Sequence, residues 1–214
     1  MRIAITQRVE VVASHGERRD CLDQQWAPFL EELGLVALPV PNNLRSPEQW
    51  LDGQGVDGVV LTGGNDLSVL VDGRNQARER DLTEAACLSL ARSRRIPVLG
   101  VCRGMQMLNH WIGGRLEPVT GHTAVRHRLQ GTPSETAFDA FTEVNSFHDW
   151  GVPAGGLAPE LIPQLFSEDG YIEAFTHNSL PWAGIMWHPE RETPFREADK
   201  ALFNRIFREG LCRH

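Results

Sequence analysis

The sequence predicts an α/β fold in which helices flank a largely parallel central sheet. Short runs rich in β-branched residues alternate with helical segments in the first half of the chain, as they do in β-α-β units. In the second half, strand-like runs follow one another directly, which predicts extra antiparallel strands. With 214 residues, 41% of them apolar, the chain is long enough for one domain with a sizeable core. We therefore expect a single domain over residues 1–214.

The first half is expected to contain four strands and three helices. Apolar positions at helical spacing mark the helices, and Gly34 ends the first of them. Uninterrupted apolar runs mark the strands, because strands of a parallel sheet are buried on both faces. In chain order, the expected elements are a strand Arg2–Thr6, a helix Cys21–Leu33, a strand Leu35–Val40, a strand Val56–Leu61, a helix Arg78–Arg94, a strand Val98–Cys102 and a helix Met105–Ile112.

Beyond Gly114 the pattern becomes more strand-like and ends in one helix. The segment Ala154–Pro163 is rich in Gly and Pro and is expected to be a surface loop. The expected elements are strands Arg115–Val119, Ala124–Leu129, Phe141–Ser146, Tyr171–Thr176 and Ala183–Trp187, followed by a helix Phe195–Arg208.

Composition excludes several classes of partner. A formal net charge of -7 disfavours nucleic acid or an anionic membrane as the main partner. No apolar stretch approaches the roughly 18–20 residues that span a bilayer. The first ten residues, MRIAITQRVE, carry charge and lack the apolar core of a signal peptide, so we expect a cytoplasmic protein. The four cysteines show no CxxC pairing, which predicts free thiols and no zinc site; Cys212 lies in a tail expected to fray.

One cysteine has flanking residues that suggest chemistry. Cys102 stands between Gly100 and Gly104, where an expected strand meets an expected helix. This G-x-C-x-G pattern follows the logic of the nucleophile elbow, in which the central residue adopts a strained conformation with its sulfur exposed. The helix that follows directs free N–H groups toward the sulfur and lowers the thiol pKa. The alternative is a small buried cysteine at the end of a core strand.

A thiol nucleophile needs a base, and one of the eight histidines is well placed. His188 ends an apolar strand, and Glu190 follows two residues later in 184-GIMWHPER-191. The proline between them stiffens the chain, so that Glu190 orients the imidazole as the third member of a triad. Taken alone, His-Pro-Glu is more often a capped turn; paired with the elbow, it favours a Cys102–His188–Glu190 triad.

An anionic tetrahedral intermediate also needs hydrogen-bond donors. Thr62-Gly63-Gly64 follows the third expected strand, and parallel sheets bring such loops together at their carboxyl edge. The backbone N–H groups of Gly64 and Arg103 are therefore candidates for an oxyanion hole. By itself the segment is more often a simple tight turn. No G-x-x-x-x-G-K-[ST] pattern follows it, which disfavours a phosphate-binding loop.

The helix that starts near Arg78 carries two acidic candidates. Asp81 and Glu84 are spaced i, i+3 and share a face, from which they would hold a substrate ammonium group or order the pocket. The alternative, equally favoured, is a solvated helix start with acidic residues near the positive end of the dipole. The basic residues of this helix, Arg80 among them, are expected to be solvated.

Three motifs in this order resemble those of the class I glutamine amidotransferases. They are 62-TGGND-66, 100-GVCRGMQ-106 and 187-WHPE-190, and the resemblance covers nearly the whole chain. It implies the flavodoxin-like fold of that family, the triad and oxyanion hole given above, and Gln106 near the bound glutamyl group. It also implies attack on the γ-carboxamide of glutamine to form a γ-glutamyl thioester, which water then hydrolyses.

Further segments resemble one branch, the γ-glutamyl-γ-aminobutyrate hydrolases of peptidase family C26. This resemblance implies that Ser146, Phe147 and His148 lie on a loop that grips the α-carboxylate and amine of the glutamyl group. The branch usually continues with VNSxHHQ, whereas Asp149 and Trp150 follow His148 here. The N-terminal segments resemble more weakly a branch that acts on γ-glutamyl groups carried by nucleotide phosphoramidates. The segments that carry these likenesses are 80-RDLTE-84, 97-PVLGVCRGMQMLN-109, 113-GGRLEPV-119, 144-VNSFH-148 and 169-DGYIEAF-175, and, for the second branch, 6-TQRVE-10 and 17-ERRDCLDQQW-26.

These features favour a cysteine-dependent hydrolase. It would cleave the γ-glutamyl amide bond of a small γ-glutamyl amine or amidate through a thioester and release glutamate. One alternative is a glutaminase subunit that supplies ammonia to a separate synthetase, since the thioester chemistry is the same. Another is a non-catalytic binding or regulatory protein, which is disfavoured because all three triad residues are present. We expect no metal and no organic cofactor, and neither nucleic acid nor membrane as a partner.

Overall fold

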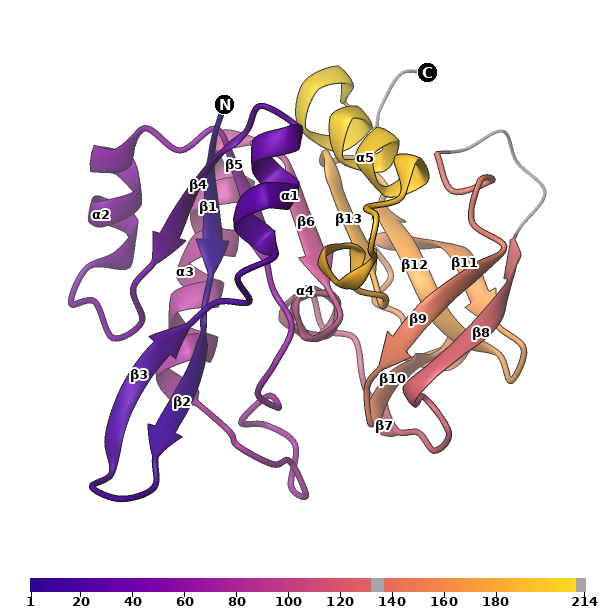
Figure 1. Cartoon of the computed structure of the whole chain (residues 1–214), viewed down its shortest axis with the longest axis horizontal. Helices are drawn as coiled ribbons and strands as arrows, with labels where there is room; N and C mark the ends of the chain where they lie inside the picture. Colours follow the sequence, from indigo (N-terminus) through magenta and orange to yellow (C-terminus); the bar gives the residue numbers. More distant parts are fainter. Residues whose placement is uncertain (132–136, 211–214) are drawn as a thin grey trace.

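The computed structural model describes residues 1–131 and 137–210, and its centre is one long mixed sheet (Figure 1). The strand order is β4-β1-β5-β6-β13-β12-β11-β8-β9. Adjacent strands from β4 to β13 are parallel, and those from β13 to β9 are antiparallel. The parallel strands are β1 (Arg2–Thr6), β4 (Val36–Val40), β5 (Gly58–Leu61), β6 (Val98–Val101) and β13 (Trp182–Ile185). The predicted class, a largely parallel sheet with extra antiparallel strands, is confirmed.

The antiparallel strands lie at one end of the molecule (Figure 1). Two short strands lie beside the main path, where β10 pairs with both β12 and β7. These strands are β7 (Glu117–Pro118), β8 (Thr123–Gly131), β9 (Glu143–Phe147), β10 (Trp150–Pro153), β11 (Leu161–Ser167) and β12 (Tyr171–His177).

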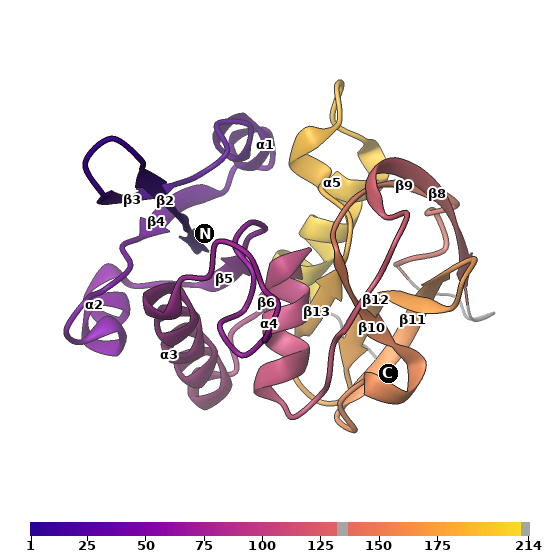
Figure 2. The same cartoon turned by 90° about the horizontal axis from the view of Figure 1, so that it is seen from below.

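Helices cover both faces of the parallel strands (Figure 2). Ile3 and Ile5 face α1 and α5, and Ala4 faces the other helix layer, as the alternation of side chains along a strand requires. One layer contains α1 (Trp26–Glu32) and α5 (Glu197–Asn204), which continues as one π-helical segment (Arg205–Glu209). The other contains α2 (Pro47–Gln54), α3 (Arg78–Arg94) and α4 (Arg103–Trp111). In the described ranges, no helix is both long enough and apolar enough to cross a membrane.

The expected bounds agree closely for the central elements, and those of β1 and α3 match residue for residue. The predicted helix from Cys21 is wrong at its start, because Cys21 pairs with Arg8 in a hairpin of β2 (Arg8–Val12) and β3 (Glu17–Cys21). The surface loop expected at Ala154–Pro163 is also partly wrong. It holds a short 3-10 helix (Ala154–Gly156), and β11 begins within it at Leu161, which is buried. Cys212 lies outside the described residues.

The buried carboxyl group of Asp199 in α5 should make the free energy of unfolding depend on pH. Burial raises the pKa of this carboxyl to about 6, and Trp187 Nε1 donates a 2.8 Å hydrogen bond to its Oδ1. The folded state therefore binds this proton more tightly than the unfolded state, and the associated stability is lost as pH rises from about 4 to about 6. Asp199→Asn keeps an acceptor for Trp187 and should stabilise the protein at pH 7.5 by on the order of 2 kcal/mol. Urea unfolding at pH 7.5 and pH 4 measures this, and equal gains at both pH values would contradict it.

Candidate active site

The site begins at the junction of β6 and α4, where Cys102 has φ +52° and ψ −108°. Positive φ is unfavourable for a residue with a side chain and is tolerated here because the surroundings hold it. The Cys102 N–H donates to the Ile185 carbonyl of β13 at 2.8 Å, and its own carbonyl accepts the first hydrogen bond of α4 from Gln106. The strained elbow predicted from the sequence is therefore present.

Gly100 and Gly104 are required by close backbone approach rather than by positive φ. A Cβ on Gly100 would lie 2.5 Å from the Gly104 carbonyl oxygen. A Cβ on Gly104 would lie 2.1 Å from the carbonyl oxygen of Leu61 in the neighbouring strand β5. Contacts this short could be relieved only by moving the backbone of β5 or α4. The two glycines let α4 start directly against β5 and β6, which sets the position of the nucleophile.

The prediction of an exposed sulfur is wrong, because Cys102 is only 5% exposed. It packs against the loop after β5, where a Cβ on Gly63 would lie 3.6 Å from Cys102 Cβ and 2.7 Å from His188 Cε1. Burial opposes ionisation of the Cys102 thiol, but the positive charges of His188, His148 and Arg191 outweigh it and lower the pKa. The buried thiol is therefore poised toward the thiolate form.

His188 follows β13 and faces the thiol. Its Nδ1 lies 2.7 Å from Oε1 of Glu190, and both side chains are buried. Its Nε2 has no hydrogen-bond partner among the described residues, so it is available to a reacting group. Burial lowers the pKa of His188, but the charges of Cys102 and Glu190 outweigh it and raise the pKa to about 9. The arrangement favours a thiolate–imidazolium pair.

Asn145 of β9 holds the backbone of His188 and was not singled out from the sequence. Its Oδ1 accepts a 2.8 Å hydrogen bond from His188 N–H, and its Nδ2 donates to the His188 carbonyl at 2.9 Å. This side chain, 6% exposed, ties the antiparallel strand β9 to the catalytic turn. The only sequence feature that points to Asn145 is its position beside Ser146 in the segment 144-VNSFH-148.

Asn145→Ala should therefore lower kcat without greatly changing KM. A base displaced by about 1 Å can cost on the order of 10²-fold in rate. Asn145→Asp keeps the acceptor for His188 N–H and should recover part of the loss. Steady-state kinetics of both variants test this. A rise in KM with kcat unchanged would instead indicate that Asn145 contacts the substrate.

Arg80 of α3 holds the loop after β5 by hydrogen bonds to its backbone. Its guanidinium donates to the carbonyl oxygens of Thr62 at 2.6 Å, Gly63 at 2.9 Å and Gly64 at 2.6 Å. Gly64 has φ +83°, and its N–H has no acceptor within the described ranges. The carbonyls are thus engaged on the α3 side, and the Gly64 amide remains a candidate oxyanion donor. The expectation that Arg80 is solvated is wrong, since it is fully buried and its pKa is lowered to about 9 by burial.

Arg103 extends this arrangement into a buried network of charges. Its side chain pairs with Asp81 and Glu84, and burial and the charge of Arg80 hold its pKa well below the ordinary value. Both oxygens of Glu84 have donors: Oε1 accepts from Thr6 and Arg80, and Oε2 from Arg103. Asp81 also accepts hydrogen bonds from Ser68. These contacts of Asp81 and Glu84 favour the expected role of ordering the pocket over contact with a substrate ammonium group, and the alternative of a solvated helix start is wrong for the buried Glu84. Their carboxylates neutralise arginines beneath the loop.

Gln106 lies one turn into α4 from the nucleophile and points to the start of β10. Its Nε2 donates to the Trp150 carbonyl at 2.9 Å, and the same carbonyl accepts a hydrogen bond from His148 Nδ1 at 2.9 Å. Gln106 and His148 thus fix the turn at residues 148–150 against α4. Both remain candidates for the wall of the glutamyl pocket.

Ser146 and Phe147 belong to strand β9, so the loop expected to contain them with His148 is corrected. Alternate residues of a strand face opposite sides. Ser146 is buried, and its hydroxyl donates to the His122 carbonyl at 2.6 Å. Phe147 is 38% exposed, with its ring edge-on to His188 at 5.8 Å and the Arg191 guanidinium above it at 4.5 Å. Phe147 therefore lies on the His188 side, apart from His148.

A small cleft opens beside the triad, between it and the β2–β3 hairpin. Its wall includes Gly63, Gly64, His188, Glu190 and two cations, Arg8 and Arg191, together with Asp23 and Trp26 near α1.

The hairpin is fixed to the same loop that carries the candidate oxyanion donor. Val9 N–H donates to Asn65 Oδ1 at 2.8 Å, and Asn65 Nδ2 donates to the Val9 carbonyl at 2.9 Å. A Cβ on Gly64 would lie 2.7 Å from Arg8 Cδ, so the side chain of Arg8 covers this glycine.

This geometry agrees with a family match. The family model of peptidase C26 matches residues 3–190, which include all three triad residues. The chain belongs to the peptidase C26 family.

Two curated members show how this peptidase C26 chain relates to others. It is 33% identical to the gamma-glutamyl-CDP-amidate hydrolase of Campylobacter jejuni, over 90% of this chain and 91% of the relative. It is 28% identical to the gamma-glutamyl-gamma-aminobutyrate hydrolase of Escherichia coli, over 93% of this chain and 89% of the relative. Like other C26 members, it is an amide-bond hydrolase.

Solved structures share the fold of this C26 chain. A glutamine amidotransferase from Thermotoga maritima superposes with a TM-score of 0.70 at 14% identity, covering 97% of this chain and 98% of the other. A putative GMP synthase subunit from Thermoplasma acidophilum gives a TM-score of 0.71 at 19% identity, covering 97% of this chain and 92% of the other. At these identities the likeness shows the fold alone.

Proposed function

We propose that this chain is a cytoplasmic hydrolase of γ-glutamyl amides that uses Cys102 as nucleophile. The observation that carries the proposal is the buried Cys102–His188–Glu190 arrangement, with a lowered thiol pKa and an imidazole ordered by a carboxylate, in a C26 chain. The named activities of both curated relatives act on γ-glutamyl compounds and support the same acyl group.

The reaction proceeds in two balanced steps. The Cys102 thiolate attacks the γ-carbonyl carbon while the N–H groups of Gly64 and Arg103 stabilise the oxyanion. His188 gives its Nε2 proton to the leaving nitrogen as the C–N bond breaks, which leaves a γ-glutamyl thioester. A water molecule then attacks the thioester carbonyl, and His188 takes a proton from this water. The C–S bond breaks, glutamate leaves and the thiolate is restored.

The leaving group is proposed to be anionic, in the manner of a nucleotide amidate. Arg8 and Arg191 line the cleft on the His188 side, where the leaving nitrogen departs. The relative with 33% identity is named for a CDP-amidate. Guanidinium groups suit phosphate oxygens because they offer paired donors in one plane. Arg8 is 46% exposed and pairs with Glu10, so an anionic ligand in the cleft would compete with Glu10 for its guanidinium.

A panel of γ-glutamyl substrates tests both parts. Mass spectrometry would follow glutamate release from γ-glutamyl amines with neutral leaving groups and from γ-glutamyl nucleotide amidates. We expect turnover without any added protein and higher kcat/KM for the amidates. Arg8→Gln should lower kcat/KM for the amidates by about tenfold and leave the neutral amines unchanged. Equal losses on both would refute the anionic leaving group, and no turnover anywhere would refute the hydrolase.

The alternative function, a glutaminase subunit, is tested by adding glutamine to the panel and measuring glutamate release with and without a synthetase. Such a protein, which supplies ammonia to a separate synthetase, would release glutamate from glutamine at a rate that rises many-fold when the synthetase is added. The fold likeness to the putative GMP synthase subunit carries no activity at 19% identity. A non-catalytic binding protein would fail to be labelled at Cys102 by a glutamine-like chloroketone.

A further inference from the structure

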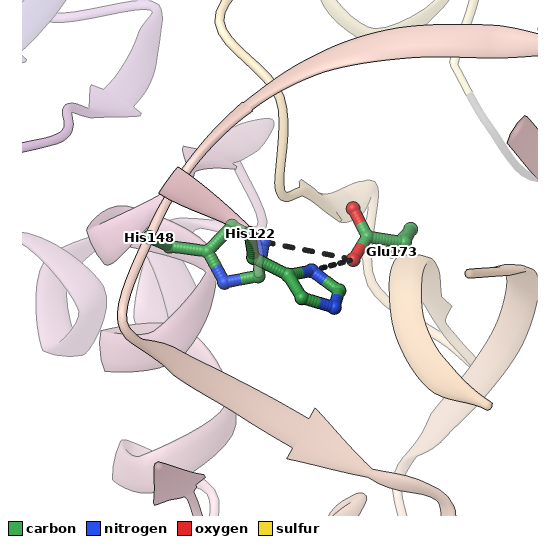
Figure 3. Close-up of side chains that lie close together, drawn as sticks. All are labelled: His122, His148 and Glu173. Carbon is green, nitrogen blue, oxygen red and sulfur yellow. Dashed lines mark ion pairs between the residues drawn. The ribbon is translucent and has the colours of Figure 1, made fainter. Parts of the chain in front are cut away.

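A second cluster of chemical groups lies among the antiparallel strands, apart from the triad. His122 precedes β8, His148 follows β9, and Glu173 lies in the middle of β12. All three are buried, with exposures of 4%, 4% and 1%. Figure 3 shows both imidazoles directed at one carboxylate oxygen. His122 Nδ1 lies 3.9 Å and His148 Nε2 lies 3.7 Å from Glu173 Oε1.

Hydrogen bonds on the far side of each ring set which nitrogen faces the carboxylate. His122 Nε2 lies 2.9 Å from the carboxylate of Asp169 and donates to it. His148 Nδ1 donates to the Trp150 carbonyl at 2.9 Å. In the neutral tautomers, the inner nitrogens therefore carry lone pairs. These two nitrogens and both oxygens of Glu173 have no hydrogen-bond partner in the described chain.

Three buried electron-pair donors that face one another require a cation between them. The three ligand atoms lie within 4.8 Å of one another. Two histidines and one glutamate are a common ligand set for zinc, and ligating histidines typically donate their other N–H to a carboxylate or carbonyl. Bond lengths of about 2.0–2.2 Å imply ligand separations of about 3.3 Å, which small side-chain movements would reach.

We propose that His122, His148 and Glu173 bind a divalent transition-metal ion of the zinc class. His127 Nε2, 3.4 Å from Glu173 Oε2, would support the other carboxylate oxygen. This site goes beyond the proposed hydrolase function, and none of its ligands belongs to the Cys102–His188–Glu190 arrangement. Its role is structural: His148 and Gln106 share the Trp150 carbonyl, so a bound ion fixes the turn at residues 148–150 beside the glutamyl pocket.

A proton is the competing occupant. Although burial lowers the pKa of His148, its contacts with Glu173 outweigh this and raise it. A protonated His148 would satisfy the same carboxylate as an ion pair. The two occupants compete, since Zn²⁺ must displace the proton to bind, and a proton held too tightly leaves no Zn²⁺ bound at pH 7.5.

Equilibrium dialysis with Zn²⁺ and elemental analysis separates them. The protein is stripped with a chelator and studied at pH 7.5 as Cys102→Ala, so that the triad cannot bind the metal. We expect one Zn²⁺ per chain that is lost in Cys102→Ala/His122→Ala. The second variant, Asp169→Asn, changes a half-exposed residue that contacts the outer nitrogen of His122 with one oxygen and the Ser167 hydroxyl with the other, and it should weaken binding by about 10–100-fold.

Controls make either outcome decisive. His15→Ala removes an exposed histidine that also neighbours a carboxylate, Glu17, and should leave the zinc affinity unchanged. Co²⁺ should give the visible absorption of a low-coordinate histidine site in Cys102→Ala and not in the His122 variant. Absence of bound Zn²⁺, or binding that neither His122→Ala nor Asp169→Asn alters, would overturn the proposal.

Discussion

Cys102→Ala is expected to abolish release of glutamate from γ-glutamyl substrates, with a loss of at least about 10⁴-fold in kcat. The thiol is the only group at the elbow that can form a thioester, and its charge interaction with His188 gives it nucleophilic character at neutral pH. The rate should be measured by mass spectrometry of glutamate, and the missing acyl-enzyme by intact mass after rapid quenching.

Cys87→Ala is the matched control for this substitution. Cys87 is fully buried in α3, and burial raises the pKa of its thiol to about 12, so it is no nucleophile. The variant should retain wild-type kcat while losing some stability from the small cavity. Activity remaining in Cys102→Ala above the level of a mock preparation would remove Cys102 from the mechanism.

Glu84→Gln is expected to produce the largest loss of stability, about 3–5 kcal/mol. The change removes one negative charge from a network in which two buried arginines, Arg80 and Arg103, depend on Asp81 and Glu84. Glutamine keeps the shape and an acceptor for Thr6, so the loss reports charge rather than packing. Because Arg80 holds the carbonyls of residues 62–64, activity should also fall in the fraction that remains folded.

Glu79→Gln makes the same change five residues earlier in α3. Glu79 pairs with Arg18 nearer the surface, and such pairs contribute about 0–1 kcal/mol. Urea unfolding of both variants at neutral pH gives the comparison. Equal effects would show that the buried charges are not stabilising the fold.

The elements that the sequence predicted well are those with strong apolar patterns. β1, β5 and β6 are buried along their whole apolar runs, and α3 is a long helix of 17 residues whose buried positions include Cys87, Leu88 and Ala91. The β2–β3 hairpin was missed because its strands are mostly exposed: β2 alternates only over 8-RVEV-11, and β3 is highly charged and shows no apolar alternation. The helix α2 has only eight residues and buries only Leu51, so few apolar positions mark it in the sequence.

The close approach of Cys102, His188 and Glu190 was predictable because motif and order along the chain point to it. The supporting residues were not, since burial cannot be read from a charge. Arg80 looks like any solvated arginine of a helix until the loop after β5 is placed over it. The histidine cluster is less visible still, because His122, His148 and Glu173 come from three separate parts of the chain with no characteristic spacing.

The two halves of this active site differ in how freely they can evolve. Cys102 and His188 are positioned by buried strands and by glycines that tolerate no side chain, so few changes in that backbone are compatible with the fold. The β2–β3 hairpin projects from the sheet and meets the cleft beside His188 through Arg8. Its exposed positions can mutate at little thermodynamic cost. New leaving groups could therefore be acquired by sequence drift in one hairpin, while the acyl-transfer chemistry is inherited unchanged.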